Sequence, residues 1–203
     1  PYLYSMAVIS HTKGIPSMRA MIMEFGDDPA VKYLDMQYML GSSILVAPIF
    51  NKEGHAQYYL PKGNWTHLLS GEVRQGGSWY EEDYDFFSLP LFVRENTLLA
   101  IGADETTADY DFEKDVQIQV YELADGKEAV CQVPTRKGET AVTVKAFRDG
   151  EKIILESSVE NQGMTYLLRN IHEVRETTGG SIKKDTEYGL VIAPDGLKTE
   201  IIL

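Results

Sequence analysis

Cysteine is almost absent from this chain, because its 203 residues include one, Cys131. A single thiol cannot form a disulfide within the chain, so the fold has to be stable without covalent cross-links, as is usual in a reducing compartment. Free cysteine behaves as a small apolar side chain, and we therefore expect Cys131 to be a buried structural residue and not a reactive thiol. The expected location is cytoplasmic.

Basic residues are also scarce. The chain has 19 Lys and Arg against 31 Asp and Glu, which gives a formal net charge of −12. Clustered Lys and Arg bind phosphate backbones and anionic membrane surfaces, so this balance argues against a nucleic-acid partner and against a membrane partner. No apolar run approaches the roughly 20 residues that span a bilayer, and no signal-peptide pattern is visible.

The sequence patterns of metal, nucleophile and phosphate sites are missing as well. The histidines are scattered, without a carboxylate cluster beside them, at His11, His55, His67 and His172. No Gly-x-Ser-x-Gly turn presents a nucleophilic serine. No glycine-rich loop lies between a strand and a helix, as a phosphate cradle requires. We therefore expect no metal and no cofactor.

The chain does contain a series of short apolar runs separated by turn residues. Val116, Ile118 and Val120 alternate with polar residues, and Val142 with Val144 repeats this period of two, which is typical of half-buried strands. Further strands are expected near residues 58–60, 65–69, 89–93, 98–101, 153–156, 165–169, 188–192 and 200–203. The pairs that favour hairpin turns are Asp125-Gly126, Lys137-Gly138, Asp149-Gly150 and Asp195-Gly196. This pattern predicts β-sandwiches built mainly from antiparallel pairs.

Helical patterns are confined to the start of the chain. Residues 1–12 predict a helix that ends before Gly14 and Pro16. The residues on one face of this helix are Leu3, Met6, Ala7 and Ser10. The mostly apolar residues 17–25 predict a strand.

A second, shorter helix is predicted between Asp28 and Gly41. Asp28 can cap it, and Pro29 suits its first position, where a missing N–H costs nothing. The residues that would share its face are Val31, Leu34 and Tyr38, and Gly41 tolerates the positive φ past a helix end. Residues 44–50, apolar on both sides, predict a strand buried on both faces.

Two groups of carboxylates are candidates for glycoside hydrolysis, in which one carboxyl donates a proton and the other attacks or activates water. They are Glu24, Asp27 and Asp28, followed by Glu81, Glu82, Asp83 and Asp85. A structural interpretation is favoured for all of them. Asp28 is the helix cap, Asp27 is its neighbour, and residues 81–85 form a solvated loop. Calcium binding by the second group is the alternative.

Aromatic residues are densest around this second acidic group. They are Trp65, Trp79, Tyr80, Tyr84, Phe86 and Phe87. Aromatic faces can stack on sugar rings, but aromatic side chains also dominate β cores. Core packing is the favoured interpretation. The alternative is that the chain is a carbohydrate-binding β-sandwich module.

Specific strings along the whole chain resemble the C-terminal portion of glycoside hydrolase family 31. In the first half they are Pro1-Tyr2-Leu3-Tyr4, Met18-Arg19-Ala20-Met21, Asp27-Asp28-Pro29-Ala30, Gln37-Tyr38-Met39-Leu40-Gly41, Val46-Ala47-Pro48, Tyr59-Leu60-Pro61, residues 63–68 and residues 93–100. In the second half, residues 125–134 look like the bacterial α-xylosidase branch of the family. The strings Leu168-Arg169-Asn170 and Gly189-Leu190-Val191 extend the likeness toward the end.

The resemblance implies a mainly β chain with two β-sandwich domains in tandem. It also implies an N-terminal helix left from a (β/α)8 barrel and one short helix in the first β domain. Residues 1–14 would be the end of the last barrel helix, residues 15–100 the proximal sandwich and residues 101–203 the distal one. The polar residues 102–110 are the candidate boundary. Without the barrel, Leu3, Met6 and Ala7 are expected to be exposed.

The resemblance also implies that the chemistry lies elsewhere. Family members are retaining enzymes whose nucleophile and acid/base are Asp residues on barrel strands. The nucleophile motif, Asp followed by an aromatic residue and Gly-Glu, does not occur in this chain, and the nearest string is Glu24-Phe25-Gly26-Asp27. No catalytic residue is therefore expected.

The function that the resemblance implies is that of a non-catalytic C-terminal fragment of a retaining α-glycosidase. The parent would be an α-xylosidase or α-glucosidase that hydrolyses terminal α-xylosyl or α-glucosyl residues. The partners of the fragment would be the parent's catalytic barrel, through which alone it would meet the sugar substrate, and further copies in a homo-oligomer.

Overall fold

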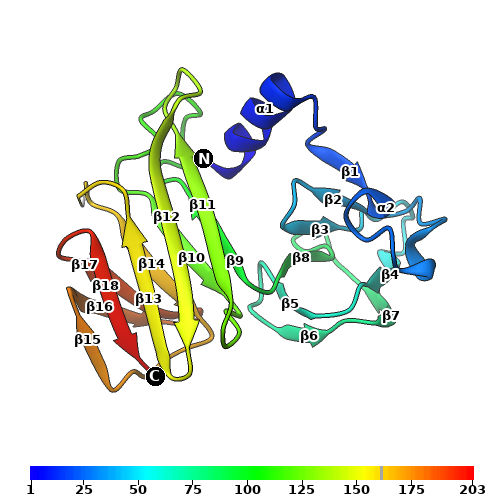
Figure 1. Cartoon of the computed structure of the whole chain (residues 1–203). Coiled ribbons are helices and arrows are strands. Elements are labelled where there is room, and N and C mark those ends of the chain that lie inside the picture. Colours follow the sequence, from blue (N-terminus) through cyan, green and yellow to red (C-terminus); the bar gives the residue numbers. More distant parts are fainter. Residues whose placement is uncertain (161) are drawn as a thin grey trace. The chain divides into compact units, whose positions relative to one another are not determined.

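The computed structural model describes residues 1–160 and 162–203, and strands dominate it. The described helices are α1 (Tyr2–Lys13), the one-turn α2 (Met21–Glu24) and the 3-10 helix η1 (Pro29–Val31) (Figure 1). None of them is long and apolar enough to cross a membrane. The predicted mainly β class is confirmed. The chain divides into two compact units: one consists of Ile9–Glu95, and the other of Pro1–Val8 together with Asn96–Leu203.

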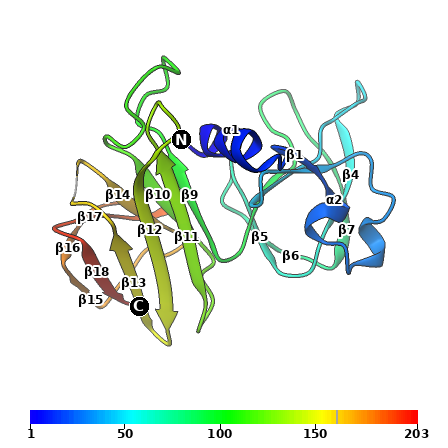
Figure 2. The same cartoon turned by 45° about the horizontal axis from the view of Figure 1, so that its top comes forward.

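The first unit, Ile9–Glu95, contains a six-stranded sheet and a two-stranded ribbon. The sheet order is β1-β2-β3-β8-β5-β6, and its neighbouring strands pair antiparallel. Its strands are β1 (Met18–Ala20), β2 (Tyr38–Leu40), β3 (Ile44–Val46), β5 (Asn64–His67), β6 (Val73–Gln75) and β8 (Leu91–Arg94). The ribbon pairs β4 (His55–Leu60) with β7 (Ser78–Asp83), also antiparallel (Figure 2).

Strand β3 lies inside the six-stranded sheet, and all of its residues are buried, as predicted for a run that is apolar on both sides. The strand is shorter than the predicted residues 44–50. It ends at Val46, because Pro48 cannot donate to a strand ladder, and Phe50 is already exposed. Trp65 fills the core beside it, and its indole Nε1 donates to the Pro61 carbonyl oxygen at 2.7 Å.

The helix predicted between Asp28 and Gly41 is wrong except for its cap. Asp28 Oδ1 accepts a hydrogen bond from the Ala30 backbone at 3.0 Å, and Pro29 begins a single 3-10 turn, η1. The chain then extends into β2. Gly41 has a positive φ of 64°, which serves the turn from β2 to β3 instead of a helix end.

The reason for this difference lies in pairing that a local pattern does not reveal. The side-chain amide of Gln37 exchanges two hydrogen bonds with the Tyr59 backbone, at 2.7 and 2.8 Å. Residues 38–40 then bond to β1 on one side and β3 on the other, which satisfies their backbone groups more fully than a short helix would.

The strand predicted at residues 17–25 is also wrong in its second half. It splits into β1 and the one-turn helix α2. The guanidinium of Arg19 pairs with Glu24, and Arg19 Nε donates to the Pro16 carbonyl at 3.0 Å, so the segment folds back on itself. An apolar run of this length does not distinguish strand from helix by itself.

The second unit has two five-stranded sheets, ordered β16-β17-β14-β10-β9 and β11-β12-β13-β18-β15. They lie in two layers (Figures 1 and 2), and buried residues from both fill one core. The strands are β9 (Thr97–Ile101), β10 (Gln117–Tyr121), β11 (Glu128–Pro134), β12 (Thr140–Asp149), β13 (Lys152–Ser157), β14 (Thr165–Arg169), β15 (Glu176–Thr178), β16 (Gly180–Thr186), β17 (Gly189–Pro194) and β18 (Lys198–Ile202). The pairs are antiparallel except β10 with β14.

The turn pairs of this unit serve two different purposes. Lys137-Gly138 and Asp149-Gly150 close hairpins as predicted, with glycine φ values of 84° and 58°. Asp125-Gly126 and Asp195-Gly196 do not, because the strands that they join, β10 to β11 and β17 to β18, belong to opposite sheets. They are crossovers between the layers.

Helix α1 matches its predicted range, and its start is anchored on the second unit. The Tyr4 hydroxyl donates to the Arg136 carbonyl at 2.7 Å, and the Tyr4 ring lies 5.0 Å from that of Phe112. Leu3 and Ala7 are exposed as expected. The expected exposure of Met6 is wrong, and its side chain is buried. The reason is that the preceding residues, Tyr4 and Ser5, hydrogen-bond to the second unit and hold this part of the helix against it.

Candidate functional site on the β4–β7 ribbon

The β4–β7 ribbon carries most of the predicted acidic and aromatic residues, on two opposite faces. Residues 81–83 belong to strand β7, so the predicted solvated loop is wrong there. Alternate residues of a strand point to opposite sides, and the cross-strand register then fixes which side chains are neighbours. The face that we call the outer face consists of His55, Gln57, Tyr59, Trp79, Glu81 and Asp83. The opposite, inner face includes Tyr58, Tyr80 and Glu82.

Glu82 is the centre of a hydrogen-bonded cluster on the inner face. Its Oε2 accepts from Arg74 Nη1 at 2.6 Å, from the Tyr58 hydroxyl at 2.7 Å and from the Tyr84 hydroxyl at 2.6 Å. Arg74 also pairs with Glu72 at 2.9 Å, and its guanidinium lies 5.2 Å from the Tyr80 ring. One carboxylate oxygen therefore joins Tyr58 and Arg74, which belong to other strands, with Tyr84, two residues further along the chain.

This cluster fixes the charge state of its members. Burial opposes ionisation of Glu82, but the hydrogen bonds from Arg74, Tyr84 and Tyr58 outweigh it and lower the pKa of Glu82 to about 2. Burial, with the hydrogen bond to Glu82, raises the pKa of Tyr84 to about 12. A carboxyl that is ionised down to this pH cannot serve as a general acid at neutral pH. Glu82 is a structural anion.

The outer face places an ionisable pair of carboxylates around an imidazole. His55 Nδ1 lies 2.9 Å from Asp83 Oδ1, and His55 Nε2 lies 3.0 Å from Glu81 Oε1. The pKa of His55 is raised, first by the hydrogen bond with Asp83, against a smaller effect of burial, and then by Glu81. The imidazole therefore bridges the two carboxylates.

Trp79 lies on the same face, two residues along the strand from Glu81, and 52% of it is exposed. Its ring centroid is 5.5 Å from that of Tyr59, with an interplanar angle of 50°. The Tyr59 hydroxyl in turn donates to Asp28 Oδ2 at 2.9 Å. Asp28 therefore caps η1 with one carboxylate oxygen, and with the other it accepts the hydrogen bond from the tyrosine whose ring contacts Trp79.

The remaining carboxylate candidates do not converge. Glu24 pairs with Arg19, and Asp85 accepts from the Phe87 backbone at 2.9 Å and from the Ser88 hydroxyl at 3.2 Å. Asp27 is exposed. In the described ranges, no group of three or more His, Cys, Asp and Glu could hold a metal ion. The calcium alternative gains no support, because Glu82 faces away from its two neighbours.

The aromatic residues divide between core and surface. Trp65 is 1% exposed, so core packing is right for it. Core packing is wrong for Trp79, and also for Phe86 and Phe87, which are fully exposed. The physical reason is the turn after β7, which Asp85 closes and which carries both phenylalanines away from the ribbon.

The other histidines and the cysteine have structural surroundings. His67 is buried with its Nε2 2.9 Å from the Leu89 carbonyl, and His172 Nδ1 lies 2.8 Å from Asp185, while His11 is exposed. Cys131 is half-buried, not fully buried as expected, and the burial of its thiol raises the pKa to about 12. The thiol is therefore protonated at neutral pH and unreactive, which agrees with the expected structural role.

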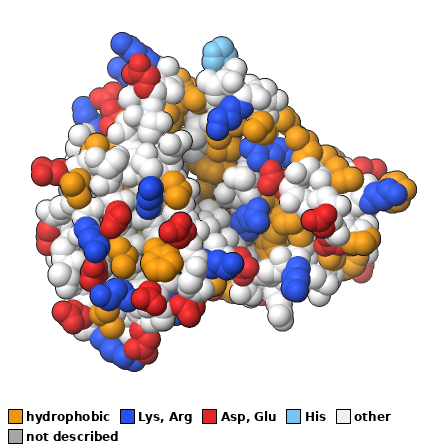
Figure 3. All heavy atoms as spheres, viewed as in Figure 1, with side chains coloured by type: hydrophobic (Ala, Val, Ile, Leu, Met, Phe, Trp, Pro, Cys, Tyr) orange, Lys and Arg blue, Asp and Glu red, His pale blue; other side chains and the backbone are white. Residues whose placement is uncertain are grey.

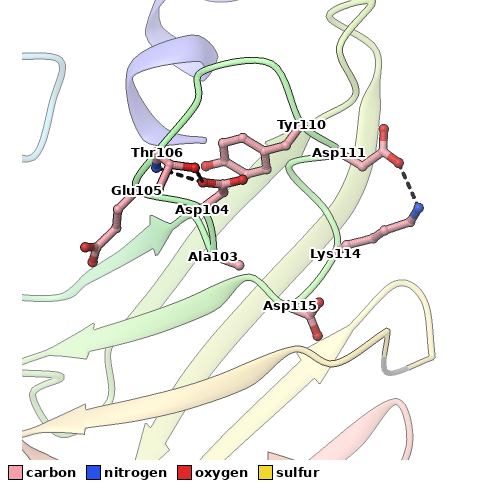
Figure 4. Close-up of a pocket in the computed structure, with 8 residues that line it drawn as sticks. All are labelled: Ala103, Asp104, Glu105, Thr106, Tyr110, Asp111, Lys114 and Asp115. Carbon is pink, nitrogen blue, oxygen red and sulfur yellow. Dashed lines mark hydrogen bonds and ion pairs between the residues drawn. The ribbon is translucent and has the colours of Figure 1, made fainter.

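An open hollow of about 530 Å³ on the second unit is the other place where carboxylates gather (Figure 4). It is lined by Ala103, Asp104, Glu105, Thr106, Tyr110, Asp111, Lys114 and Asp115. Asp104 Oδ1 accepts from the backbone and hydroxyl of Thr106, both at 2.7 Å, and Asp111 pairs with Lys114 at 2.8 Å. The hydrogen bonds from Thr106 lower the pKa of Asp104, and Lys114 lowers that of Asp111. Neither is a proton donor at neutral pH.

The sequence alone does not reveal Gln57 as a member of the outer face, or Arg74 of β6 as a partner of the inner face. The available signal is the spacing of two residues between Tyr80, Glu82 and Tyr84, which has the period of a strand. That spacing predicts a shared face. It does not predict that Arg74, from the preceding strand, completes it.

Comparison with known proteins decides the family. The model of the glycosyl hydrolase family 31 C-terminal domain matches residues 14–99, and the model of the alpha-xylosidase YicI C-terminal domain matches residues 111–203. The chain belongs to glycoside hydrolase family 31, as a C-terminal part. The two matches follow one another along the chain and together leave out residues 1–13 and 100–110.

Individual relatives agree with this assignment. The family 31 chain is 40% identical to alpha-xylosidase XylQ of Lactiplantibacillus pentosus over 159 residues, which are 76% of this chain and 21% of that protein. It is 32% identical to an alpha-xylosidase of Emericella nidulans over 172 residues, which are 74% of this chain and 22% of that protein. This chain thus spans about a fifth of the length of these relatives.

A solved structure shares the fold over the whole chain. The family 31 dextranase of Flavobacterium johnsoniae, complexed with glucose, superposes with a TM-score of 0.81. The alignment covers 100% of this chain and 31% of the dextranase, at 19% sequence identity. At that identity the likeness concerns the fold and carries nothing about substrate.

Proposed function

We propose that this chain is a non-catalytic C-terminal part of a retaining α-glycosidase that hydrolyses terminal α-xylosyl or α-glucosyl residues. The observation that carries the proposal is the pair of consecutive family matches, residues 14–99 and 111–203, each to a C-terminal domain. The two alpha-xylosidase relatives favour an α-xylosidase as the parent, with an α-glucosidase as the other member of the same substrate class.

The chemistry of the carboxyl groups supports a non-catalytic role. A retaining glycosidase needs one carboxyl with a raised pKa that donates a proton to the leaving group. In the described part of the chain, the carboxyl groups with a shifted pKa are Glu82, Asp104, Asp111 and Glu200, and each pKa is lowered. We therefore propose that this chain contains no catalytic residue and that the barrel of the parent supplies the catalytic carboxyl groups.

The role of the chain is proposed to be support of that barrel. In this view residues 1–14 end the last barrel helix, residues 15–100 form the proximal sandwich and residues 101–203 the distal one. Large apolar side chains reach the surface of the first unit near α2 and the ribbon (Figure 3). They include Ile22, Met23, Tyr33, Phe50, Phe86 and Phe87. Exposed apolar patches mark protein interfaces, which suits a barrel or a second copy as partner.

Hydrolysis by the parent tests this proposal. The parent protein, with its barrel, should release the aryl group from an aryl α-xyloside or an aryl α-glucoside, with the anomeric configuration retained. We further propose that the parent works in the cytoplasm, where one unpaired cysteine needs no partner. A parent that cleaves neither glycoside, although folded, would contradict the assignment of substrate class.

One observation favours a second function, the carbohydrate-binding module. Trp79 is half-exposed among hydrogen-bonding side chains, which is how a sugar platform is built.

A further inference from the structure

The outer face of the ribbon combines an aromatic ring with a row of polar groups in one register. Trp79 lies opposite Tyr59, Glu81 opposite Gln57, and Asp83 opposite His55. Residues two apart on a strand lie about 7 Å from one another, a distance that a pyranose ring with its hydroxyl groups can bridge. One sugar ring on Trp79 would therefore reach Glu81 and Gln57, and a second ring would reach the next pair, Asp83 and His55.

The aromatic ring is held in place before any ligand arrives. Trp79 rests on Tyr59 at 5.5 Å, and the Tyr59 hydroxyl is fixed by Asp28 at 2.9 Å. Tyr59 itself is buried. A platform that is already ordered loses little side-chain entropy on binding, which is what makes weak stacking contacts useful.

The polar groups are ordered in the same way. His55 engages Oδ1 of Asp83 at 2.9 Å and Oε1 of Glu81 at 3.0 Å, so each carboxylate keeps its other oxygen for a ligand. Both carboxylates and Gln57 are exposed. Ionised carboxylates accept strong hydrogen bonds from hydroxyl groups, and an amide both donates and accepts.

We propose that the outer face is a surface site for a short neutral oligosaccharide. One ring stacks on Trp79, and hydroxyl groups of that ring or the next donate to Glu81 and Asp83. That the sugar is an α-linked glucosyl or xylosyl oligosaccharide rests on the proposed function. The stacking and the hydrogen bonds rest on the geometry of the ribbon alone.

The composition of this face fits a sugar better than a protein partner. The centre of a protein interface is depleted of charged residues, whereas the outer face carries two carboxylates and an imidazole along the same strands as Trp79. A protein partner that covered these charged side chains would remove their hydrating water without offering hydrogen bonds in its place. On the turn of Phe86 and Phe87 the carboxylate, Asp85, is already engaged by the Phe87 backbone and the Ser88 hydroxyl, so these two rings suit a protein partner better. The two carboxylates also disfavour an acidic polysaccharide.

Tryptophan fluorescence allows a direct test, because the chain has two tryptophans in opposite surroundings. Trp65 is 1% exposed and Trp79 is 52% exposed. Acrylamide should therefore quench Trp79 selectively, and a bound sugar should protect it. We expect maltotriose or isoprimeverose to reduce the quenching with a millimolar midpoint, and calorimetric titration of the same chain to give the same dissociation constant.

Variants locate the site. Trp79→Ala should weaken binding at least about tenfold, and Gln57→Ala about two- to threefold, with the circular dichroism spectrum unchanged. Phe87→Ala is the matched control, since it removes an exposed aromatic residue outside the outer face, and its affinity should equal that of the unmodified chain. Trp79→Phe should restore part of the binding lost in Trp79→Ala.

Three results would overturn the inference. They are a flat titration with both sugars, sugar binding that survives Trp79→Ala, and a Trp79 that is already protected from acrylamide in the full-length parent without sugar. Failure here is distinct from failure of the proposed function. A parent that hydrolyses aryl α-glycosides while this chain binds no sugar removes only the surface site.

Discussion

Glu82 shows how much of this fold depends on contacts between distant residues. Its local sequence, an acidic run, predicts a solvated loop. In the structure, Glu82 instead accepts hydrogen bonds from Arg74, Tyr58 and Tyr84. Asp28 is the opposite case. Its role as a cap is local, because its acceptor meets the backbone two residues later, and the sequence predicts it. Residue roles that depend on near neighbours are predictable, and those that depend on strand pairing are not.

Replacing Glu82 by Gln should destabilise the first unit by about 2 kcal/mol. Two tyrosine hydroxyls and Arg74 would lose their common ionised acceptor, and a neutral amide cannot accept from all three as well. Urea denaturation measures the change. Glu81→Gln, on the exposed face of the same strand, is the control and should cost less than about 0.5 kcal/mol. Equal effects of the two variants would contradict a special role for the inner cluster.

The same residue sets a pH dependence. The pKa of Glu82 falls on folding from 4.5 to about 2. A carboxyl with a lowered folded pKa stabilises the fold above its unfolded pKa, and this contribution is lost as the pH falls through the folded value. The stability difference between the chain and its Glu82→Gln variant should therefore be constant above about pH 4.5 and shrink toward pH 2. A difference that stays constant over this range would refute the assignment.

Among the elements, strands with strict alternation are the ones that the sequence predicts well. In β12, Val142, Val144 and Ala146 face the core, and in β14 the bounds are those expected. Short apolar runs are less informative. Residues 17–25 have no strong period, and the helical spacing of Val31, Leu34 and Tyr38 is misleading, because hydrogen bonds of the Arg19 and Gln37 side chains accompany other conformations there.

Two glycines at the ends of the β4–β7 ribbon allow a matched test of how closely the chain packs there. Gly54 has a φ of 79°, and a Cβ there would lie 2.2 Å from the Tyr84 carbonyl oxygen. Gly77 has a φ of 81°, with nothing within 4 Å of a Cβ. Gly77→Ala should cost about 1–2 kcal/mol from backbone strain alone. Gly54→Ala should cost clearly more, because the clash with backbone adds to the strain. Similar melting temperatures for the two variants would show that the contact between the loops is looser than described.

For the whole molecule, composition and strand pattern predict a mainly β chain, and the family strings predict its relatives. The pattern alone does not show which strands share a sheet. Asp125-Gly126 and Asp195-Gly196 have the sequence of hairpin turns and nevertheless join opposite layers. Sheet assignment depends on which apolar faces meet in the core, and that is a property of all strands together.

The central claim is that this chain carries none of the catalytic residues of its proposed parent. Hydrolysis of an aryl α-xyloside and an aryl α-glucoside by the purified chain tests it most directly, with a mock purification from the same host as the control. We expect release of the aryl group at the rate of the mock sample. Turnover above that rate, which increases with the amount of chain and disappears when the chain is removed by immunodepletion, would contradict it.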